Sequence, residues 1–193
     1  MDRNKIERGF REVLEGLGLD PQHPTVRDTP RRTAEAWVTE LCAGLSEPEP
    51  DMELMPLAEG HVAGLIVLDR IPVKSLCAHH LLPFFGEAVV GYVPRASICG
   101  LSKLSRVVSH FARRPQLQEQ LTQQIAQSLE RTLRPAGVGV LIRATHLCME
   151  FRGVNHPGTM TTSTLLGCLE SHPQQRAEFL ALAHPGAGRP AGG

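Results

Sequence analysis

The hydrophobic period of the chain changes along its length, and this change constrains the fold more than any other feature. Before residue 50, and again over 101–133, apolar residues recur every three or four positions, which predicts amphipathic helices. Over 64–94 and 138–167 the chain is rich in β-branched residues and is interrupted by Gly and Pro, which predicts strands. Helices at the start and between two sets of strands indicate an α+β fold.

The same patterns give approximate boundaries for the elements. The expected strands are 64–76, 86–94, 138–153 (one long strand or a bent pair) and 159–167. The expected helices are 6–17, a second helix capped by Asp28 or Thr29, 101–111, 117–133 and 173–183. Ser171 and Gln174 have the spacing of a capping box for the last helix. Residues 46–56 are interpreted as a Pro-rich acidic connector, and 184–193 as a disordered tail.

The charge balance and the first residues limit the class of protein. The chain has 20 basic and 20 acidic residues, so it lacks the basic excess of a typical nucleic-acid binder. No apolar run is long enough for a membrane span, and the first ten residues lack the apolar core of a signal peptide. We therefore expect a cytoplasmic protein. In that reducing compartment, its five cysteines are interpreted as buried thiols or metal ligands.

A cysteine and two histidines follow the first expected strand. In the segment SLCAHHLLPF, Cys77 and His80 have the Cys-x-x-His spacing of half a metal site, and His79 lies between them. Two ligands do not hold a zinc ion, so further ligands are needed from elsewhere in the chain.

The remaining ligand is predicted within 138–153. If this strand is continuous, its period of two places His146, Cys148 and Arg152 on one face, opposite the more apolar face. Cys148 then completes a set of three with Cys77 and His80, and three protein ligands leave a position open for catalysis. A closed structural site would need His79 or His146 as a fourth ligand, and this alternative stays open. The other cysteines are interpreted as ordinary buried thiols.

Seven motifs together resemble the GTP cyclohydrolase I family. They are SLCAHHLLPF, GYVP, GLSKLSRVV, RRPQLQEQLTQQIA, RPAGVGV, THLCM and RGV, in this order, over about residues 65–170. Several long motifs at matching separations are far more specific than a single Cys-x-x-His. DTPRR near the start and RAEFL near the end extend the resemblance more weakly.

The resemblance implies a fold, an assembly and a reaction. The fold is a T-fold, an antiparallel sheet with a helix pair packed on one face, over 51–183 and preceded by a helical region over 1–50. The assembly is a toroidal homodecamer with active sites between subunits. The reaction converts GTP and water to 7,8-dihydroneopterin triphosphate and formate, the first step of tetrahydrofolate and tetrahydropterin synthesis. Neither a nucleic acid nor a membrane is an expected partner.

The resemblance also implies roles for individual residues. The zinc ligands correspond to Cys77, His80 and Cys148, and the acid–base pair to His79 and His146. The substrate-binding residues correspond to the guanine-anchoring Gln118 and Glu119, to Ser102, and to the phosphate-binding Lys103, Arg106, Arg152 and, more weakly, Arg32.

These residue types suit the reaction. Zinc lowers the pKa of a bound water to about 7, and two histidines match the two proton transfers that ring opening at guanine C8 requires. The basic residues suit a triphosphate, and Lys103 and Arg106 share a helix face. Two alternative functions are compatible with the same motifs. One is a paralogue that stops at the ring-opened formamide or uses another purine nucleotide, and the other is a non-catalytic zinc-stabilised interaction module.

Overall fold

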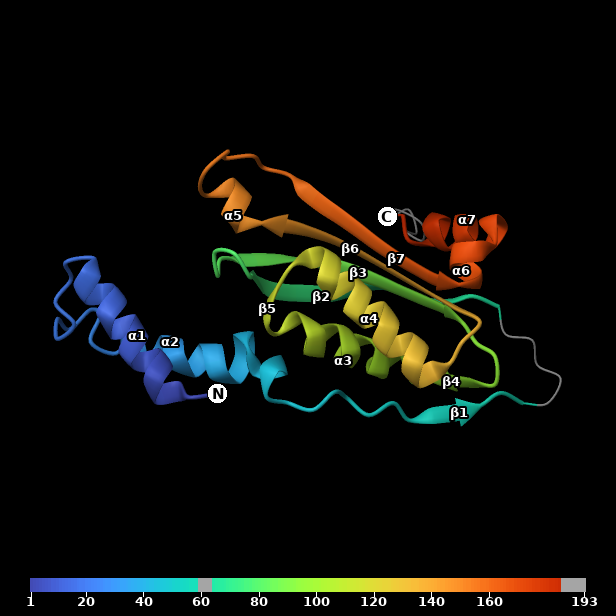
Figure 1. Ribbon diagram of the computed structural model, residues 1–193, viewed down its shortest axis with the longest axis horizontal. Coiled ribbons are helices and arrows are strands. Elements are labelled where there is room, and N and C mark those ends of the chain that lie inside the picture. The colour runs from blue at the N-terminus through green and yellow to red at the C-terminus, as the bar shows by residue number, and fades with distance from the viewer. Residues whose placement is uncertain (59–63, 185–193) are drawn as a thin grey trace, which may run out of the picture.

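A five-stranded sheet forms the centre of the computed structural model, which describes residues 1–58 and 64–184 (Figure 1). The strand order is β5-β2-β3-β6-β7, with β2 pairing parallel to β5 and the other neighbours antiparallel. The bounds are β2 (Ile66–Cys77), β3 (Pro83–Val93), β5 (Pro115–Gln116), β6 (Gly137–His146) and β7 (Thr159–Gly167). The sequence therefore predicts the α+β class and the presence of the four long strands correctly, although not the end of the third.

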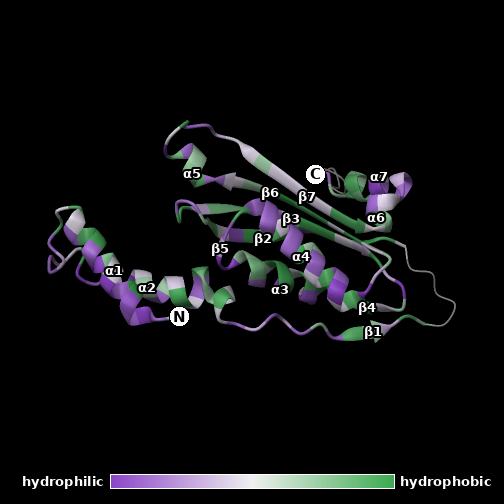
Figure 2. Cartoon of the chain, viewed as in Figure 1, coloured by the Kyte–Doolittle hydropathy of each residue, from purple (hydrophilic) through white to green (hydrophobic). Residues whose placement is uncertain are grey.

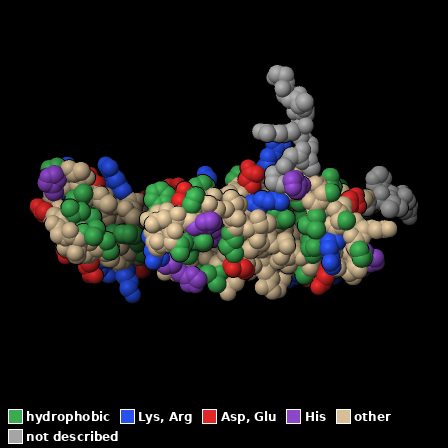
Figure 3. Space-filling view, turned by 90° about the horizontal axis from the view of Figure 1, so that it is seen from above, with side chains coloured by type: hydrophobic (Ala, Val, Ile, Leu, Met, Phe, Trp, Pro, Cys, Tyr) green, Lys and Arg blue, Asp and Glu red, His purple; other side chains and the backbone are tan. Residues whose placement is uncertain are grey.

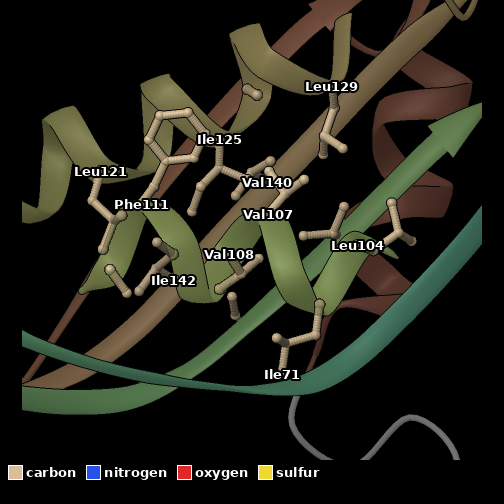
Figure 4. Close-up of a cluster of buried hydrophobic side chains, with 14 of the residues drawn as sticks. Ile71, Leu104, Val107, Val108, Phe111, Leu121, Ile125, Leu129, Val140 and Ile142 are labelled. Carbon is tan, nitrogen blue, oxygen red and sulfur yellow. The ribbon is translucent and has the colours of Figure 1, made fainter. Parts of the chain in front are cut away.

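Two helices, α3 (Leu101–Ala112) and α4 (Gln118–Leu133), cover one face of the sheet. Leu121, Ile125 and Leu129 recur every four residues along α4, and none of them is exposed. Because strand side chains alternate, the even-numbered residues of β6, such as Val140 and Ile142, meet this helical stripe. Figure 4 shows these side chains pointing toward one another between the helices and the sheet. Their burial forms the main core.

The opposite face of the sheet is covered at one end only. There, α6 (Cys168–Ser171) and α7 (Pro173–Leu182) lie beside β6 and β7 (Figure 1). Phe179 of α7 is fully buried, and a Cβ added to Gly91 or Gly139 would lie 2.9 or 2.8 Å from its ring. The aromatic ring therefore occupies the space that side chains on these two strand positions would need.

The N-terminal helices lie beyond the other end of the sheet (Figure 1). Helices α1 (Arg3–Gly16) and α2 (Thr29–Ala36) pack side by side, with an ion pair of 2.7 Å between Arg3 and Glu35. Phe10 of α1 also packs on Trp37, the residue directly after α2, with ring centroids 5.3 Å apart. Asp28 precedes α2 as predicted, although its side chain makes no cap hydrogen bond. The chain continues through a π-helical turn, η1 (Trp37–Leu41), and a 3₁₀ turn, η2 (Ala43–Leu45).

Three expectations are corrected by the structure. The expected long strand over 138–153 ends at His146, where the chain enters a single helical turn, α5 (Leu147–Glu150). The 46–56 connector contains a short strand, β1 (Leu54–Pro56), which pairs with β4 (Ser97–Cys99). The last helix has His172 as its N-cap, without a side-chain cap bond, because the Ser171 hydroxyl donates to the Gly167 carbonyl instead. The tail predicted over 184–193 lies almost entirely outside the described residues.

The surface is mixed in character. Figure 2 shows the inner strands as largely hydrophobic and β7 as intermediate along most of its length, which fits its alternating burial. On the face in Figure 3, basic and acidic side chains are interspersed rather than gathered in separate patches. None of the helices within 1–58 and 64–184 is both long and apolar enough to span a membrane.

Candidate metal centre and its surroundings

Cys77 and His80 come together through a tight turn at the end of β2. The carbonyl of Cys77 accepts hydrogen bonds from the amides of His80 and Leu81, at 3.2 and 2.7 Å, and Leu81 has a positive φ of 56°. The Ala78 amide donates to the Gln116 carbonyl of β5 at 3.0 Å, which anchors the turn to the sheet edge. As a result the Cys77 sulfur and Nδ1 of His80 lie 3.8 Å apart.

Cys148 reaches the same place from β6. In the pairing of β3 with β6, Phe84 lies opposite His146, so β6 ends beside the beginning of β3. The helical turn of α5 then carries Cys148 over to Cys77. The potential ligand atoms of Cys77, His80 and Cys148 all lie within 4.8 Å of one another. The predicted set of three is therefore brought together, by a helical turn rather than by a continuing strand.

The cluster fits a metal by its spacing and its chemistry. With bonds of about 2.3 Å to sulfur and 2.0 Å to nitrogen, a tetrahedral zinc ion holds its ligand atoms roughly 3.5–3.8 Å apart. Two thiols and an imidazole are ligands that suit such a soft or borderline cation. Across the described ranges, this is the only group of three or more His, Cys, Asp or Glu side chains with atoms close enough to share an ion.

Burial, and then the neighbouring Cys77 thiol, raise the pKa of the Cys148 thiol in the chain without a metal. A bound cation acts in the opposite direction, because a thiol that coordinates a metal loses its proton. Cys77 is buried, Cys148 is half-buried and His80 is exposed, so the cluster lies at the surface with its thiols turned inward. The protein therefore leaves one side of the cluster accessible.

His146 lies at the rim of the main core. The expectation that His146 and Cys148 share a strand face opposite the core is wrong, because Val140, Ile142 and Ala144 on that face are buried beneath α3 and α4. The His146 ring stacks on Phe84 with centroids 4.5 Å apart and an interplanar angle of 9°. Burial lowers the pKa of His146, and the carboxylate of Glu119 partly opposes this effect.

The other predicted residues near the cluster make different contacts. Gln118 is 1% exposed at the start of α4, and its side-chain oxygen lies 2.7 Å from Nε2 of His146. Glu119, the next residue, is exposed in the first turn of α4. Nη1 of Arg152 lies 2.6 Å from Nε2 of His80. His79 is exposed, with its ring edge-on to His80 at a centroid distance of 6.1 Å.

The remaining basic residues are not brought to the cluster within one chain. Helix α3 begins beside β4 and ends beside β5, which pairs with Cys77 at the cluster. At 1.5 Å per residue, Arg106 and Lys103 lie about 9 and 14 Å along the axis from the end of α3. Ser102 lies further still. Arg32 lies on α2, with its guanidinium 3.8 Å from Asp28 and largely exposed.

Sequence reasoning missed two contacts. The stacking of Phe84 on His146 depends on the register between β3 and β6, and no local signal in the sequence fixes this register. The contact of Arg152 with His80 depends on the chain direction after α5. A shared strand face suggested that Arg152 lies near the ligands, and it does, although the strand does not continue that far.

Comparison with known proteins gives a consistent result. The model of the family described as GTP cyclohydrolase I matches residues 6–184. The chain is 46% identical over 184 residues to the GTP cyclohydrolase 1 of Sulfurihydrogenibium sp., covering 94% of this chain and 95% of that protein. The GTP cyclohydrolase 1 of Nitrosospira multiformis is 48% identical over 189 residues, covering 95% of this chain and 98% of that protein.

A further relative is the GTP cyclohydrolase 1 of Aquifex aeolicus, which is 46% identical over 184 residues and covers 94% of this chain and 97% of that protein. Among solved structures, the apo form of the archaeosine synthase QueF-Like covers 52% of this chain and 92% of its own, with 16% identity and a TM-score of 0.41.

Proposed function

The chain belongs to the GTP cyclohydrolase I family and is an enzyme, and from that premise we propose that it converts GTP and water to 7,8-dihydroneopterin triphosphate and formate. This reaction would supply the synthesis of tetrahydrofolate or tetrahydropterin. The observation that carries the proposal is the cluster of Cys77, His80 and Cys148. His146 precedes Cys148 by two residues, and the charge of Glu119 acts on His146. We assign the sheet with its helix pair to the T-fold on the same premise.

Zinc is the metal that we propose for the cluster. Two thiolates and one imidazole form a three-ligand set of the catalytic kind, in which zinc activates water for hydrolysis at neutral pH. Cys77 and Cys148 would hold the ion from the buried side. His80 would hold it from the exposed side, which is open to solvent.

His146 and His79 are the proposed proton carriers. Opening the imidazole ring of guanine needs a proton at N7 and a second transfer when the C–N bond breaks, and histidines suit both. The His146 ring is partly buried and stacks on Phe84, whereas the His79 ring is exposed beside His80. The two imidazoles therefore differ in their exposure to solvent.

Glu119 is the proposed recognition residue for guanine. Its carboxylate is exposed at the start of α4 and close enough to His146 to influence its charge. Guanine presents adjacent N1–H and N2–H donors, and one carboxylate can accept from both. Adenine presents an acceptor at N1, so its binding would leave the carboxylate unpaired.

The triphosphate site is proposed to be shared between subunits. Arg152 and the cluster belong to one end of the chain, whereas Ser102, Lys103 and Arg106 lie toward the far end of α3. A second copy would bring its own α3 to this cluster, as in the toroidal homodecamer that the family resemblance implies. Arg32, on the projecting N-terminal helices, would act in the same assembly.

Incubation of the zinc-loaded protein with GTP, followed by separation and identification of the products, tests the proposed function. We expect formate and 7,8-dihydroneopterin triphosphate in equal amounts, and no reaction with ATP. Accumulation of the ring-opened formamide alone would indicate the paralogue. Absence of any turnover, together with a zinc ion held by four protein ligands, would indicate a non-catalytic interaction module.

A further inference from the structure

We propose that Gln118 is a positioning residue, which acts by orienting the ring of His146 and by fixing which ring nitrogen faces the substrate. This inference rests on the proposed function, in which His146 carries a proton. It gives Gln118 a different role from the contact with guanine that the family resemblance implies. The hydrogen bonds around the buried amide carry the argument.

The amide nitrogen of Gln118 faces the sheet. It lies 3.1 Å from each of three acceptors, which are the carbonyls of Ile142 and Met160 and the hydroxyl of Thr162. An amide with its oxygen on this side would place that oxygen against two carbonyl oxygens, which is repulsive. The nitrogen therefore belongs here, and both of its hydrogens are used by protein groups.

Two hydroxyl groups secure this orientation. The Thr122 hydroxyl donates its single hydrogen to the main-chain carbonyl of Gln118 at 2.7 Å. The contact of 2.6 Å between the hydroxyls of Thr122 and Thr162 must therefore use the hydrogen of Thr162. With its own hydrogen committed, Thr162 can only accept from the amide nitrogen of Gln118. The two amide hydrogens of Gln118 are shared among three acceptors, so the amide cannot turn over without breaking several buried hydrogen bonds.

The orientation of the amide determines that of the imidazole. The side-chain oxygen of Gln118 lies 2.7 Å from Nε2 of His146, and an amide oxygen only accepts, so Nε2 carries the hydrogen. Phe84 stacks on the ring and holds its plane. None of the described residues forms a hydrogen bond with Nδ1. The neutral ring therefore has its lone pair on Nδ1, and the proton exchanged with substrate passes through that atom.

In this geometry the side chain of Gln118 has no free hydrogen-bonding group for guanine. Its side chain is 1% exposed, and both ends of its amide are bonded to the protein. Glu119 is exposed and lies next in the chain, so it is the residue that is free to contact a base. Adjacent residues on α4 thus have separate roles, one in orienting the imidazole and one in binding.

A double-mutant cycle tests this role. Gln118→Met keeps the length of the side chain and removes both hydrogen-bonding groups. We expect kcat to fall by about 10–100-fold, the usual cost of losing a partner that orients a functional histidine, with the Kd for GTP and the zinc content unchanged. In the His146→Ala background, Gln118→Met should lower kcat no further, because its effect acts through the imidazole.

Thr162→Val provides a milder variant if Gln118→Met does not fold. It removes one acceptor of the amide, and we expect a smaller loss of kcat that also disappears in the His146→Ala background. Thr161→Val is the matched control, because Thr161 is exposed and its side chain points to the other face of the sheet, so kcat should not change.

Two results would overturn the role of Gln118. One is a weaker Kd for GTP with unchanged kcat, which is the signature of a guanine contact. The other is an additive loss in the His146→Ala background. The ¹⁵N chemical shifts of the His146 ring test the geometry without turnover: we expect the Nε2–H form in the wild type and a mixture of tautomers in Gln118→Met. These shifts distinguish a failure of this inference from a failure of the proposed function, which would appear as wild-type protein inactive on GTP.

Discussion

The two ends of strand β6 are built in different ways. At the Gly137 end the backbone is packed so closely that a Cβ on Gly137 would lie 2.7 Å from the Cys168 sulfur, and one on Gly139 would lie 2.8 Å from the Phe179 ring. At the His146 end, polar side chains replace this packing. There the imidazole of His146, the cluster of Cys77, His80 and Cys148, and the single turn of α5 lie near the surface.

We infer from this difference that the residues that determine stability and those that determine chemistry lie at opposite ends of one strand. The packed end depends on shape, so its residues should govern the free energy of unfolding. The polar end depends on hydrogen bonds and ligand spacing, so its residues should govern metal content, binding and turnover. Substitutions at each end test this contrast.

Cys148→Ser should have the largest effect. Loss of a thiolate removes both a charge and a soft ligand, so we expect loss of most of the metal and of essentially all ring opening of GTP. Elemental analysis and product assay measure the two effects. Cys168→Ser, at the packed end, is the matched control and should retain both metal and turnover. Full metal occupancy in Cys148→Ser would remove Cys148 from the ligand set.

His146→Ala should keep the metal and lose rate. Proton transfer by a positioned side chain contributes about 10²–10⁴-fold, so kcat should fall within this range. The metal content should match that of the wild type, because His146 bonds to Gln118 rather than to the cluster. A metal-free His146→Ala protein would instead identify His146 as a fourth ligand and the site as closed.

Phe179→Ala should show the opposite behaviour. Removing a fully buried phenylalanine leaves a cavity against Gly91 and Gly139, so we expect a loss of about 3–5 kcal/mol in the free energy of unfolding. Denaturant unfolding measures this loss, and kcat of the folded protein should stay close to wild type. Phe151→Ala, at a position that is 75% exposed near the polar end, serves as the control and should change stability by less than about 0.5 kcal/mol. A fall in kcat for Phe179→Ala would show that the two ends are coupled.

Glu119→Gln should weaken binding alone. The amide replaces one acceptor with a donor that faces a guanine N–H, so we expect the Kd for GTP to rise by about two orders of magnitude, at roughly 1.5–3 kcal/mol for each hydrogen bond to a charged group. Equilibrium binding of GTP to the metal-loaded variant measures the change. Glu130→Gln, exposed at the far end of α4, is the control. Unchanged affinity in Glu119→Gln would mean that Glu119 only stabilises the first turn of α4 through the helix dipole.

The smallest expected effect is a change in acid stability at His110, which is buried in α3. Burial first, then the charges of Arg114 and Arg113, lower its pKa from 6.5, while Glu49 and Glu47 oppose this. The Nη2 of Arg114 lies 2.8 Å from its Nε2, which fits a neutral ring that accepts this hydrogen bond.

A lowered pKa means that the unfolded chain binds more protons than the folded chain as the pH falls below about 6.5. The stability that the neutral His110 provides is therefore complete above this pH and is lost as the pH falls toward the folded pKa. Denaturant unfolding from pH 7.5 to 5 should show a steeper loss in the wild type than in His110→Phe. Equal slopes in the two proteins would contradict this expectation.

The sequence predicts the helices and strands well because their signals are local. The stripe of Leu121, Ile125 and Leu129 and the β-branched residues of 159–167 identify their elements without reference to any other part of the chain. The three residues of the cluster are also predicted, because Cys-x-x-His spacing indicates Cys77 and His80 and the family resemblance implies Cys148. The continuous strand expected to place Cys148 ends at His146. The helical turn of α5 is not predicted, since residues 147–150 continue the alternation of the strand before them.

Contacts between distant segments could not be predicted either. The amide network of Gln118 joins α4 to β6 and β7, and the stacking of Phe84 on His146 requires the register of two strands. These contacts depend on long-range pairing, which composition and period do not encode. The family resemblance implies a guanine contact for Gln118, whereas in the fold both ends of its amide bond to protein groups.

The position of the cluster in the strand order also has a consequence for chain topology. Cys77 ends β2 and Cys148 follows β6, and β3 lies between these two strands in the sheet. An ion bound to both sulfurs would act as a cross-link that closes a loop of about 70 residues. By lowering the entropy of the unfolded chain, a permanent cross-link of that span raises the free energy of the unfolded state by about 4 kcal/mol at room temperature. Removing the ion with a chelator would then abolish this cross-link as well as the catalytic activity. We expect melting after chelation to begin where β2, β3 and β6 meet α5.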